Sequence, residues 1–244
     1  MLSDLDNVLV IIPVLNEERT IDSVVSALGQ LGLRHIRVVD NGSCDRSGQR
    51  AAAAGAAVVL EPQRGYGQAC WRGLQKLPEA VEWILFCDGD GSDDLAQIPT
   101  MLAHRSNHSL ILGDRRATAA GQRVMTPIQN FGNALATLLI HWGWGYRYRD
   151  LGPMRLIHRR ALEQIQMRDR GFGWTVEMQA RAVECGLSIC ELPVGYYPRR
   201  GGRSKISGTL KGSVQAGTII LTTLGRLYWR RLRQRRSFSV QADA

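Results

Sequence analysis

Paired cysteines and long apolar runs are both missing from this sequence of 244 residues. Its five scattered cysteines form no CxxC pair and have no histidine at zinc-ligand spacing, which excludes a zinc finger or ribbon and predicts a reducing compartment. No run approaches the about 18 apolar residues of a membrane-spanning helix. The first residues carry Asp4 and Asp6 in place of the basic region that opens a signal peptide. We therefore expect a cytoplasmic protein.

Lysine is also scarce, since only three of the 31 basic residues are lysines. Six arginines fall within residues 226–236, and subtracting them from the formal net charge of +9 leaves +3 for the rest of the chain. The body is therefore mildly basic, and the excess charge belongs to the tail. Such a tail suits an anionic membrane surface. A basic nucleic-acid-binding module is the alternative, but tail charge alone gives only salt-sensitive association without sequence specificity.

Short apolar runs alternate with amphipathic segments through the first half of the chain. The predicted strands cover residues 8–12, 36–40, 57–60, 83–87 and 110–112, and the predicted helices cover 17–31, 43–54, 67–77 and 95–104. The strand runs are continuously apolar, as expected where helices cover both faces of a sheet. The pattern predicts an α/β fold with a mostly parallel central sheet flanked by helices and a Rossmann-like nucleotide-binding half.

The second half of the chain is less regular. Its predicted elements are helices over 126–142, 161–166 and 175–185, a last strand over 188–194, a Gly/Arg/Ser loop over 198–208 and a weakly amphipathic helix over 209–229. The length suits one large domain with a short appendage. We therefore expect a domain over residues 1–205, an amphipathic, arginine-rich helical segment over 206–236 and a disordered tail over 237–244.

Polar or glycine-rich residues follow each of the first four predicted strands. They are Pro13-Val-Leu-Asn16-Glu17, Asp40-Asn41-Gly42-Ser43, Arg64-Gly65-Tyr66-Gly67 and Asp88-Gly89-Asp90-Gly91-Ser92. In an open parallel sheet, ligands bind beyond the carboxyl ends of the strands. We therefore expect these four turns to meet at one edge of the sheet and to form a ligand site.

Asp88 and Asp90 stand where an apolar strand ends. Residues two apart leaving a strand direct both carboxylates to one side, and the glycine after each lets the backbone fold closely around an ion. Hard oxygen ligands of this kind suit Mg²⁺ or Mn²⁺, which keep positions open for substrate phosphates. We assign Asp93 and Asp94 instead to capping the helix over 95–104.

In their order and spacing, these turns resemble those of family 2 glycosyltransferases of the GT-A fold. The matching segments are Pro13-x-x-Asn16-Glu17, the Asp40-Asn41-Gly42-Ser43 turn and the Asp88-x-Asp90 pair. Three later segments resemble those of the dolichyl- and polyprenyl-phosphate sugar transferases: Gly113-Asp114-Arg115, Asp150-Leu-Gly152-Pro-Met-Arg155 and Arg199-x-x-Gly202-x-Ser204-Lys205. The resemblance covers about residues 8–205. It implies a metal-dependent glycosyltransferase that moves a hexose from a UDP- or GDP-sugar to a polyprenyl or dolichyl phosphate or a related lipid.

The resemblance also implies roles for individual residues. Those that would bind the nucleotide sugar are Pro13, Leu15, Asn16, Glu17, Val39, Asp40, Asn41, Gly65, Asp88, Gly89, Asp90 and Arg115. A divalent metal, Mg²⁺ or Mn²⁺, would be held by Asp88 and Asp90, with Ser92 as the candidate third ligand. The catalytic residues would be Asp90, Arg115, Arg199 and Lys205, and the acceptor-binding residues would be Asp150, Arg155, Glu177, Arg199, Ser204 and Lys205.

The chemistry of the acceptor decides whether the reaction needs a general base. A lipid phosphate is already an anionic nucleophile, whereas a hydroxyl acceptor needs a carboxylate to take its proton. The candidate bases are Asp94, Asp150 and Glu177. Transfer to a hydroxyl of a lipid, a glycan or a small metabolite is therefore the alternative activity for the same fold.

Three residues depart from the pattern of the family, and one of them is Ser92, which stands where the relatives often have a glutamine. Asn41 replaces the second aspartate after the second strand, and an amide presents different hydrogen-bonding groups to a nucleobase. Asp114 places a carboxylate beside Arg115. There it would orient that arginine, recognise a sugar hydroxyl or form a surface ion pair with Arg116.

The helical segment after residue 208 is too polar to enter a bilayer, because it contains Lys211, Gln215 and several glycines. We expect an interfacial helix, peripheral to the membrane, whose apolar side faces the lipid. That side would consist of Val214, Ile219, Ile220, Leu221, Leu224 and Leu227. The alternative is a helix packed on the core of the domain and followed by a solvated basic tail.

Overall fold

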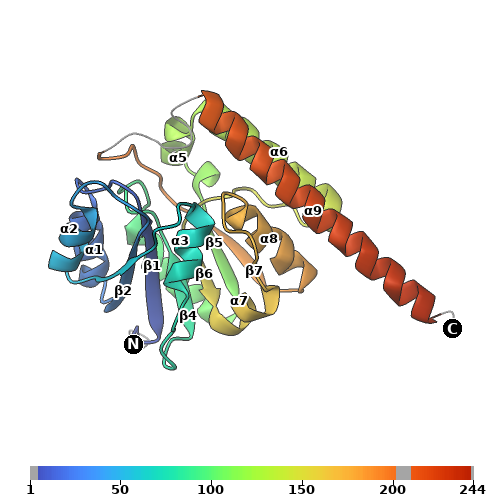
Figure 1. Cartoon of the computed structure of the whole chain (residues 1–244), viewed down its shortest axis with the longest axis horizontal. Coiled ribbons are helices and arrows are strands. Elements are labelled where there is room, and N and C mark those ends of the chain that lie inside the picture. The colour runs from blue at the N-terminus through green and yellow to red at the C-terminus, as the bar shows by residue number, and fades with distance from the viewer. Residues whose placement is uncertain (1–4, 202–209, 243–244) are drawn as a thin grey trace.

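The computed structural model describes residues 5–201 and 210–242, which form a central sheet with helices on both faces (Figure 1). The strands are β1 (Val8–Val14), β2 (His35–Asp40), β3 (Ala57–Leu60), β4 (Trp83–Phe86), β5 (Leu110–Asp114), β6 (Arg155–His158) and β7 (Ile189–Pro193). They lie in the order β3-β2-β1-β4-β6-β5-β7, and β6 is the one among them that runs antiparallel to its neighbours. The predicted α/β fold with a mostly parallel sheet is confirmed.

Two layers of helices bury the sheet. The helices are α1 (Ile21–Gln30), α2 (Ser47–Ala53), α3 (Tyr66–Gly73), α4 (Ile98–Ala103), α5 (Ala119–Val124), α6 (Pro127–Trp144), α7 (Arg159–Ile165), α8 (Trp174–Glu184) and α9 (Leu210–Ala242). Side chains of β1 alternate between the layers, as a strand requires. Leu9 and Ile11 pack with α3 and α6 to α9, whereas Val10 and Ile12 pack with α1, α2 and α4. This two-sided burial explains the continuous apolar runs of the strands.

Strand β6 is the element of the sheet that the sequence analysis missed. Its four residues begin with Arg155 and end with His158, so the apolar pattern of the strand is only two residues long. The strand pairs with both β4 and β5, which fixes it in the middle of the sheet. Tertiary pairing, rather than local pattern, therefore makes this segment a strand.

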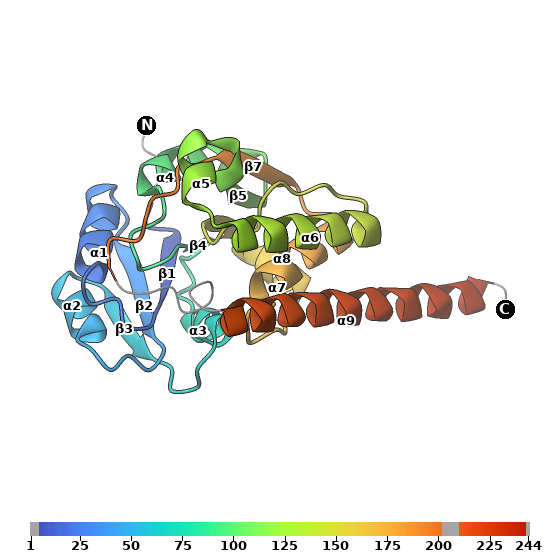
Figure 2. The same cartoon turned by 90° about the horizontal axis from the view of Figure 1, so that it is seen from above.

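Helix α9 lies alongside α6 and continues beyond its end (Figure 2). Leu224 and Leu227 are buried in the core together with residues of α8, and Ile220 packs against the same cluster. The ring of Tyr228 makes an edge contact with Trp144, with 6.3 Å between the ring centroids. The contacts dock the middle of α9 onto the domain.

The expectation that Leu224 and Leu227 face a membrane is therefore wrong, because both side chains pack on α8 and α6 instead. The alternative prediction, a helix packed on the core of the domain, is therefore correct for this part of α9. Leu221, one turn before Leu224, is 44% exposed. The helix also continues to Ala242, past the predicted end at residue 229. Within the described residues, none of the helices combines the length and the apolar character needed to cross a membrane.

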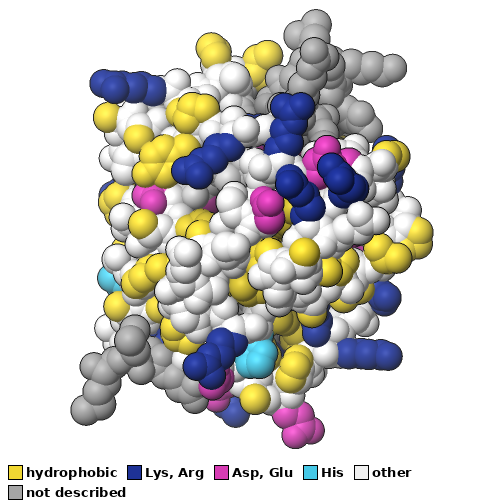
Figure 3. Space-filling view, turned by 90° about the vertical axis from the view of Figure 1, so that its left-hand side faces the viewer, with side chains coloured by type: hydrophobic (Ala, Val, Ile, Leu, Met, Phe, Trp, Pro, Cys, Tyr) yellow, Lys and Arg dark blue, Asp and Glu magenta, His cyan; other side chains and the backbone are white. Residues whose placement is uncertain are grey.

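The face of the molecule formed by α1 and α2 carries charges of both signs (Figure 3). Its described Lys and Arg side chains are interspersed with Asp and Glu side chains. This agrees with the small net charge of the body of the chain once the arginines of residues 226–236 are set aside.

Candidate active site

A cavity of about 330 Å³ lies beyond the carboxyl ends of β1, β2 and β4, and we call it the strand-end cavity. Its lining consists of Pro13, Val14, Leu15, Glu17, Asn41, Arg64, Gly65, Tyr66, Ala69, Asp88, Gly89, Asp90, Phe172 and Arg199. Residues predicted from all four turns are therefore brought together at one edge of the sheet. Among the residues predicted to bind the nucleotide sugar or the metal, Asn16, Val39, Asp40, Ser92 and Arg115 are not part of this lining.

The turn after β1 is held by the turn after β2. Asn16 adopts a left-handed conformation, with a φ of 54°, which asparagine tolerates better than most residues. Its side-chain oxygen accepts a hydrogen bond from the N–H of Cys44 at 2.7 Å, and its own N–H donates to the hydroxyl of Ser43 at 3.0 Å. The N–H of Glu17 donates to the hydroxyl of Ser47 at 2.8 Å. Asn16 thus shapes the turn that directs the buried Glu17 side chain toward the cavity.

Asn41 organises the neighbouring loop through both ends of its amide. Its Nδ2 donates to the carbonyls of Glu61 and Gln63 at 2.9 and 2.7 Å, and its Oδ1 accepts from the N–H of Gly65 at 2.8 Å. A carboxylate has no hydrogen to donate, so an aspartate could not make the first two bonds. Asn41, which departs from the family pattern, therefore holds this loop in place, and its amide nitrogen and oxygen are already hydrogen-bonded within the protein. Asp40, beside it, accepts from the N–H of Ser43.

The acidic turn after β4 is folded back on itself. Both the N–H and the hydroxyl of Ser92 donate to Oδ1 of Asp90, at 2.9 and 2.5 Å. Asp93 accepts from the N–H of Asp88 at 2.8 Å, and Asp94 accepts from the N–H of Gly195 at 3.0 Å. The prediction that Asp93 and Asp94 cap the following helix is wrong, because that helix begins without a side-chain cap and both carboxylates are used by other backbone groups.

Negative charge accumulates in this turn. Burial raises the pKa of Asp88 well above its ordinary value, and the neighbouring Asp93 and Asp90 raise it further. Burial likewise raises the pKa of Asp93 to about 7. The Arg199 side chain approaches from the opposite wall, with its Nε 3.0 Å from Oδ2 of Asp90 and its Nη1 3.6 Å from Oε1 of Glu17. The turn therefore holds more buried carboxylate charge than its arginine neighbours neutralise.

Arg115 and Asp150 form a two-pronged ion pair beside the acidic turn. Nε and Nη2 of Arg115 donate to the two carboxylate oxygens of Asp150 at 2.8 and 3.0 Å, and the guanidinium lies 4.9 Å from the ring centroid of Tyr196. Burial alone would raise the pKa of Asp150, but Arg115 outweighs it and lowers that pKa below its ordinary value. Burial acts to lower the pKa of Arg115, and Asp150 in turn keeps it above the ordinary value.

Asp114 has a role that none of the three sequence-based alternatives described. Its side chain is buried and accepts from the N–H groups of Arg116 and Ala117, which caps the short turn after β5. Burial excludes the predicted surface ion pair with Arg116. The carboxylate that orients Arg115 is instead that of Asp150.

Arg155 and Glu177 support the walls of the site and do not line the strand-end cavity. Arg155 is fully buried and donates to the carbonyls of Gly152 and Thr175. Oε2 of Glu177 accepts from the N–H groups of Arg168 and Asp169 at 2.9 and 2.6 Å. Both side chains therefore bind backbone of their own domain. The remaining predicted residues, Ser204 and Lys205, lie outside the described part of the chain.

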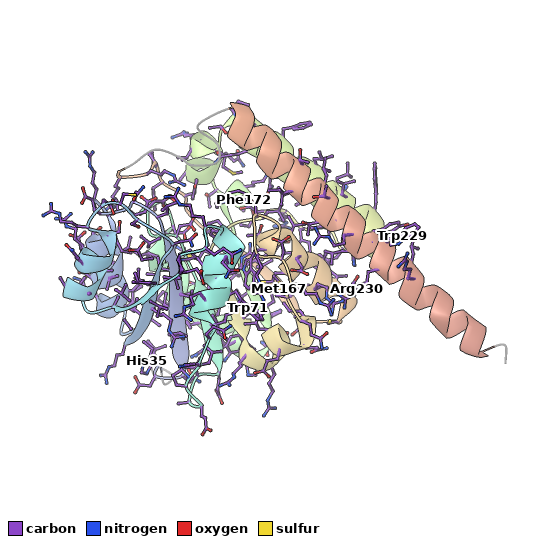
Figure 4. All side chains as sticks on the ribbon, in the orientation of Figure 1. His35, Trp71, Met167, Phe172, Trp229 and Arg230 are labelled. Atoms are coloured by element: carbon purple, nitrogen blue, oxygen red, sulfur yellow. The ribbon has the colours of Figure 1, made fainter. Side chains whose placement is uncertain are left out.

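The loop over residues 168–173 supplies a wall that the sequence analysis did not predict. Its Phe172 side chain lines the cavity, close to the α3 helix that carries Trp71 (Figure 4). The loop carbonyls of Arg170 and Gly171 accept from the N–H groups of Gln68 and Gly67 at 2.7 and 3.0 Å. No local signal marks Phe172 as a site residue, because it reaches the cavity only through this tertiary contact.

The Gly-Tyr-Gly segment at the start of α3 makes that contact possible. A Cβ atom at Gly67 would lie 2.8 Å from the carbonyl carbon of Arg170, so a side chain there would collide with the loop backbone. Tyr66 lines the cavity between these glycines. The segment resembles part of a dinucleotide-binding motif in sequence, but its glycines serve close packing of two backbones.

Comparisons with known proteins agree with this architecture. Residues 9–166 match the sequence model of Glycosyl transferase family 2. An uncharacterized glycosyltransferase of Mycobacterium tuberculosis is 36% identical over 215 residues, which cover 86% of this chain and 94% of that protein. The undecaprenyl-phosphate mannosyltransferase of Micrococcus luteus is 30% identical over 226 residues, covering 84% of this chain and 89% of that protein.

A solved structure of similar fold is glucosyl-3-phosphoglycerate synthase from Mycobacterium tuberculosis in complex with Mn²⁺, uridine diphosphate and glucosyl-3-phosphoglycerate. It superimposes with a TM-score of 0.71 at 21% identity, over 89% of this chain and 78% of that one. At this identity the likeness concerns the fold.

Proposed function

Because the chain belongs to glycosyl transferase family 2 and has the GT-A fold, we propose that it moves a hexose from a UDP- or GDP-sugar to a polyprenyl or dolichyl phosphate or a related lipid. The observation that carries the proposal is the strand-end cavity, where Asp88 and Asp90 face the Arg199 side chain. The cavity therefore has a positively charged side chain that can bind a diphosphate and carboxylates that can bind a cation next to it.

We propose that Asp88 and Asp90 hold a divalent cation, Mg²⁺ or Mn²⁺, as the metal-containing complex of the mycobacterial synthase suggests by analogy. The donor set fits, because the turn carries buried carboxylate charge that a cation would offset. In the described residues, no three His, Cys, Asp or Glu side chains are grouped for metal binding. Two carboxylates would leave the other positions to phosphate oxygens and water, which is the usual arrangement for Mg²⁺. The Ser92 hydroxyl would hold Asp90 in place.

The reaction forms one bond and breaks one. An oxygen of the acceptor phosphate bonds to the anomeric carbon of the sugar, and the bond from that carbon to the nucleoside diphosphate breaks with its electron pair on the leaving oxygen. A cation bound at the site would supply positive charge against this developing negative charge. Arg199, which lines the cavity, would add a guanidinium donor to phosphate oxygens. Arg115, whose Nε and Nη2 are held by Asp150, would add positive charge beside the acidic turn.

The state of the candidate bases favours a phosphate over a hydroxyl as acceptor. Asp150 is paired with Arg115 and its pKa is lowered, so it is a weak proton acceptor. Glu177 accepts two backbone hydrogen bonds and Asp94 accepts one from Gly195. A phosphate acceptor needs none of these carboxylates as a base. The undecaprenyl-phosphate mannosyltransferase and a polyprenol monophosphomannose synthase among the relatives support the same acceptor class.

We further propose peripheral association with the cytoplasmic face of a membrane through the arginine-rich segment 206–236. Exposed Trp229 and the arginines near it would meet lipid headgroups. Each basic residue near an anionic surface contributes on the order of 1 kcal/mol. Association of this kind would bring the site to the membrane where a lipid phosphate resides.

The proposal is tested by transfer of labelled sugar from UDP- and GDP-sugars into lipid containing polyprenyl phosphate, with Mg²⁺ or Mn²⁺. Asp90→Ala should lower the turnover by at least about 100-fold, because it removes charge that acts on the diphosphate. Asp22→Asn is the matched control, since Asp22 lies on α1 outside the cavity lining. Label in a soluble acceptor alone would contradict the lipid-phosphate proposal and leave the glycosyltransferase assignment in place.

A further inference from the structure

A second and larger cavity, of about 610 Å³, lies where α5 and α6 meet the end of β5. Its lining consists of Asp114, Arg116, Ala117, Gln122, Asn130 and Arg149, and we call it the α6 cavity. The two cavities share no lining residue. Nothing in the proposed handling of the nucleotide sugar uses this second space.

The α6 cavity presents a surplus of positive charge. Arg116 and Arg149 both line it, and the Nη1 of Arg116 donates to the Arg149 carbonyl at 3.2 Å, which ties the two segments together. The carboxylate of Asp114 is buried and turned to the backbone N–H groups of the following turn. Two arginines therefore line this space together with one carboxylate that is already hydrogen-bonded, which suits an anion with several oxygens.

The α6 cavity adjoins the ion pair at the edge of the candidate active site. Arg115 lies in sequence between two residues of the lining, and Asp150 directly follows a third. The Arg115 guanidinium lies 4.9 Å from the ring centroid of Tyr196, and the N–H of the next residue, Tyr197, donates to the carbonyl of Ser92 in the acidic turn at 2.9 Å. A ligand in the α6 cavity would therefore lie next to the Arg115–Asp150 pair, at the edge of the candidate active site.

An apolar face of α6 leads away from this cavity. Ile128, Phe131, Leu138 and Trp142 are 48%, 69%, 40% and 72% exposed. Their spacing of three, seven and four residues places them along one side of the helix, whereas Ala136 and Ile140 on the other side are buried. At 1.5 Å per residue the face extends for about 21 Å. It begins beside Asn130, which lines the α6 cavity.

We propose that the α6 cavity binds the phosphate of the lipid acceptor and that the exposed face of α6 carries the first part of its hydrocarbon chain. This inference rests on the proposed function and assigns its acceptor site. A cationic cavity that continues into an apolar helix face fits an amphiphile with one anionic end. A second copy of the chain fits poorly, because it would bring further net positive charge toward a cavity that is already lined by two arginines.

The two parts of the proposed site are tested with two acceptors, a ten-carbon prenyl phosphate in water and undecaprenyl phosphate in detergent micelles. Arg149→Ala should raise the KM for both acceptors by about 10- to 100-fold, because a charged hydrogen bond to the phosphate is lost. Phe131→Gln and Trp142→Gln should raise the KM for undecaprenyl phosphate by about 10-fold and leave the short acceptor unchanged. The KM for the nucleotide sugar should stay the same in all three variants.

Matched controls come from similar side chains elsewhere on the surface. Arg160→Ala removes an exposed arginine of α7, and Leu60→Gln removes a 68% exposed side chain of β3. Neither should change the KM for either acceptor. Thermal unfolding of every variant separates a loss of binding from a loss of folding.

The outcomes distinguish this inference from the proposed function. If the wild type glycosylates both prenyl phosphates and the Arg149, Phe131 and Trp142 variants behave as the controls do, the proposed acceptor site is wrong and the function stands. If the wild type uses only a soluble phosphate ester, with a KM that Arg149→Ala raises, the lipid part is overturned. If no phosphate is glycosylated, the proposed function fails, and the acceptor site fails with it.

Discussion

The two cavities differ in how their polar groups are held. In the strand-end cavity, Asn41 and Asp90 are bound by neighbouring backbone and side-chain groups before any ligand arrives. In the α6 cavity, Arg149 is exposed and the adjoining helix face keeps large apolar side chains in solvent. Fixed donors and acceptors suit a small, highly charged ligand whose charge changes during reaction. An open cationic space beside an apolar face suits a long, flexible ligand that arrives from a membrane.

Asp150→Ala should have the largest effect, because it breaks the buried ion pair with Arg115 beside the α6 cavity. The Asp150 side chain is completely buried and that of Arg115 is 13% exposed. Removing one partner of such a pair leaves the other charge buried without compensation, at a cost of about 3–5 kcal/mol. Urea unfolding should therefore show a large fall in the free energy of unfolding, together with loss of transfer activity.

The pH dependence of stability sharpens the same prediction. Because the folded state lowers the pKa of Asp150, the pair stabilises the fold at pH values above the unfolded value of about 3.9. That contribution is lost as the pH falls through the lowered pKa of the folded state. The stability difference between the wild type and Asp150→Asn should therefore be constant near neutral pH and shrink in acid. A difference that stays constant down to pH 2 would contradict the ionised pair.

The sequence predicted the strand-end cavity well because its residues obey a local rule. Glu17, Asn41 and Asp90 each lie within four residues of the end of a strand, and parallel strands bring their carboxyl ends to one edge. Apolar runs of four or five residues were enough to locate those strands. The positions of the side chains therefore followed from the order of elements alone.

The parts that the sequence did not predict depend on contacts between distant segments. Phe172 reaches the strand-end cavity through a loop that lies more than 100 residues from the α3 backbone it pairs with. Asp94 leaves its expected helix cap because the N–H of Gly195 binds its carboxylate. The α6 cavity combines Arg116 and Arg149 from two separate turns. A pattern within one window of sequence carries no signal for such pairs.

Asn41→Asp should have the next largest effect, and the change that it causes should be limited to the wall of the strand-end cavity. The carboxylate would face two carbonyl oxygens that now accept hydrogen bonds from Nδ2, so we expect a loss of about 1–3 kcal/mol in unfolding free energy. The KM for the nucleotide sugar should rise because the loop forms part of the cavity wall. KM values for UDP- and GDP-sugars measured side by side check the interpretation. A change in nucleotide preference at unchanged stability would show instead that Asn41 contacts the base.

Thr223→Val should have the smallest effect, and it tests whether helix α9 and the strand-end cavity are independent of each other. The buried Thr223 hydroxyl of α9 donates to Oδ2 of Asp169 at 3.1 Å, and Oδ1 of Asp169 accepts from Gly171 at 2.8 Å. This chain of bonds links α9 to the loop whose Phe172 lines the strand-end cavity. Valine keeps the shape of threonine and removes the donor, so we expect a loss of about 1 kcal/mol.

If α9 supports that loop, Thr223→Val should also raise the KM for the nucleotide sugar by a few-fold. Thr222→Val is the matched control, because the Thr222 hydroxyl donates to carbonyls within α9 itself. An equal KM in the two variants would mean that α9 and the strand-end cavity behave as separate parts. A higher KM in Thr223→Val alone would mean that docking of α9 contributes to nucleotide-sugar binding. A ligand or a surface that moves α9 would then change nucleotide-sugar binding through the hydrogen bond between Thr223 and Asp169.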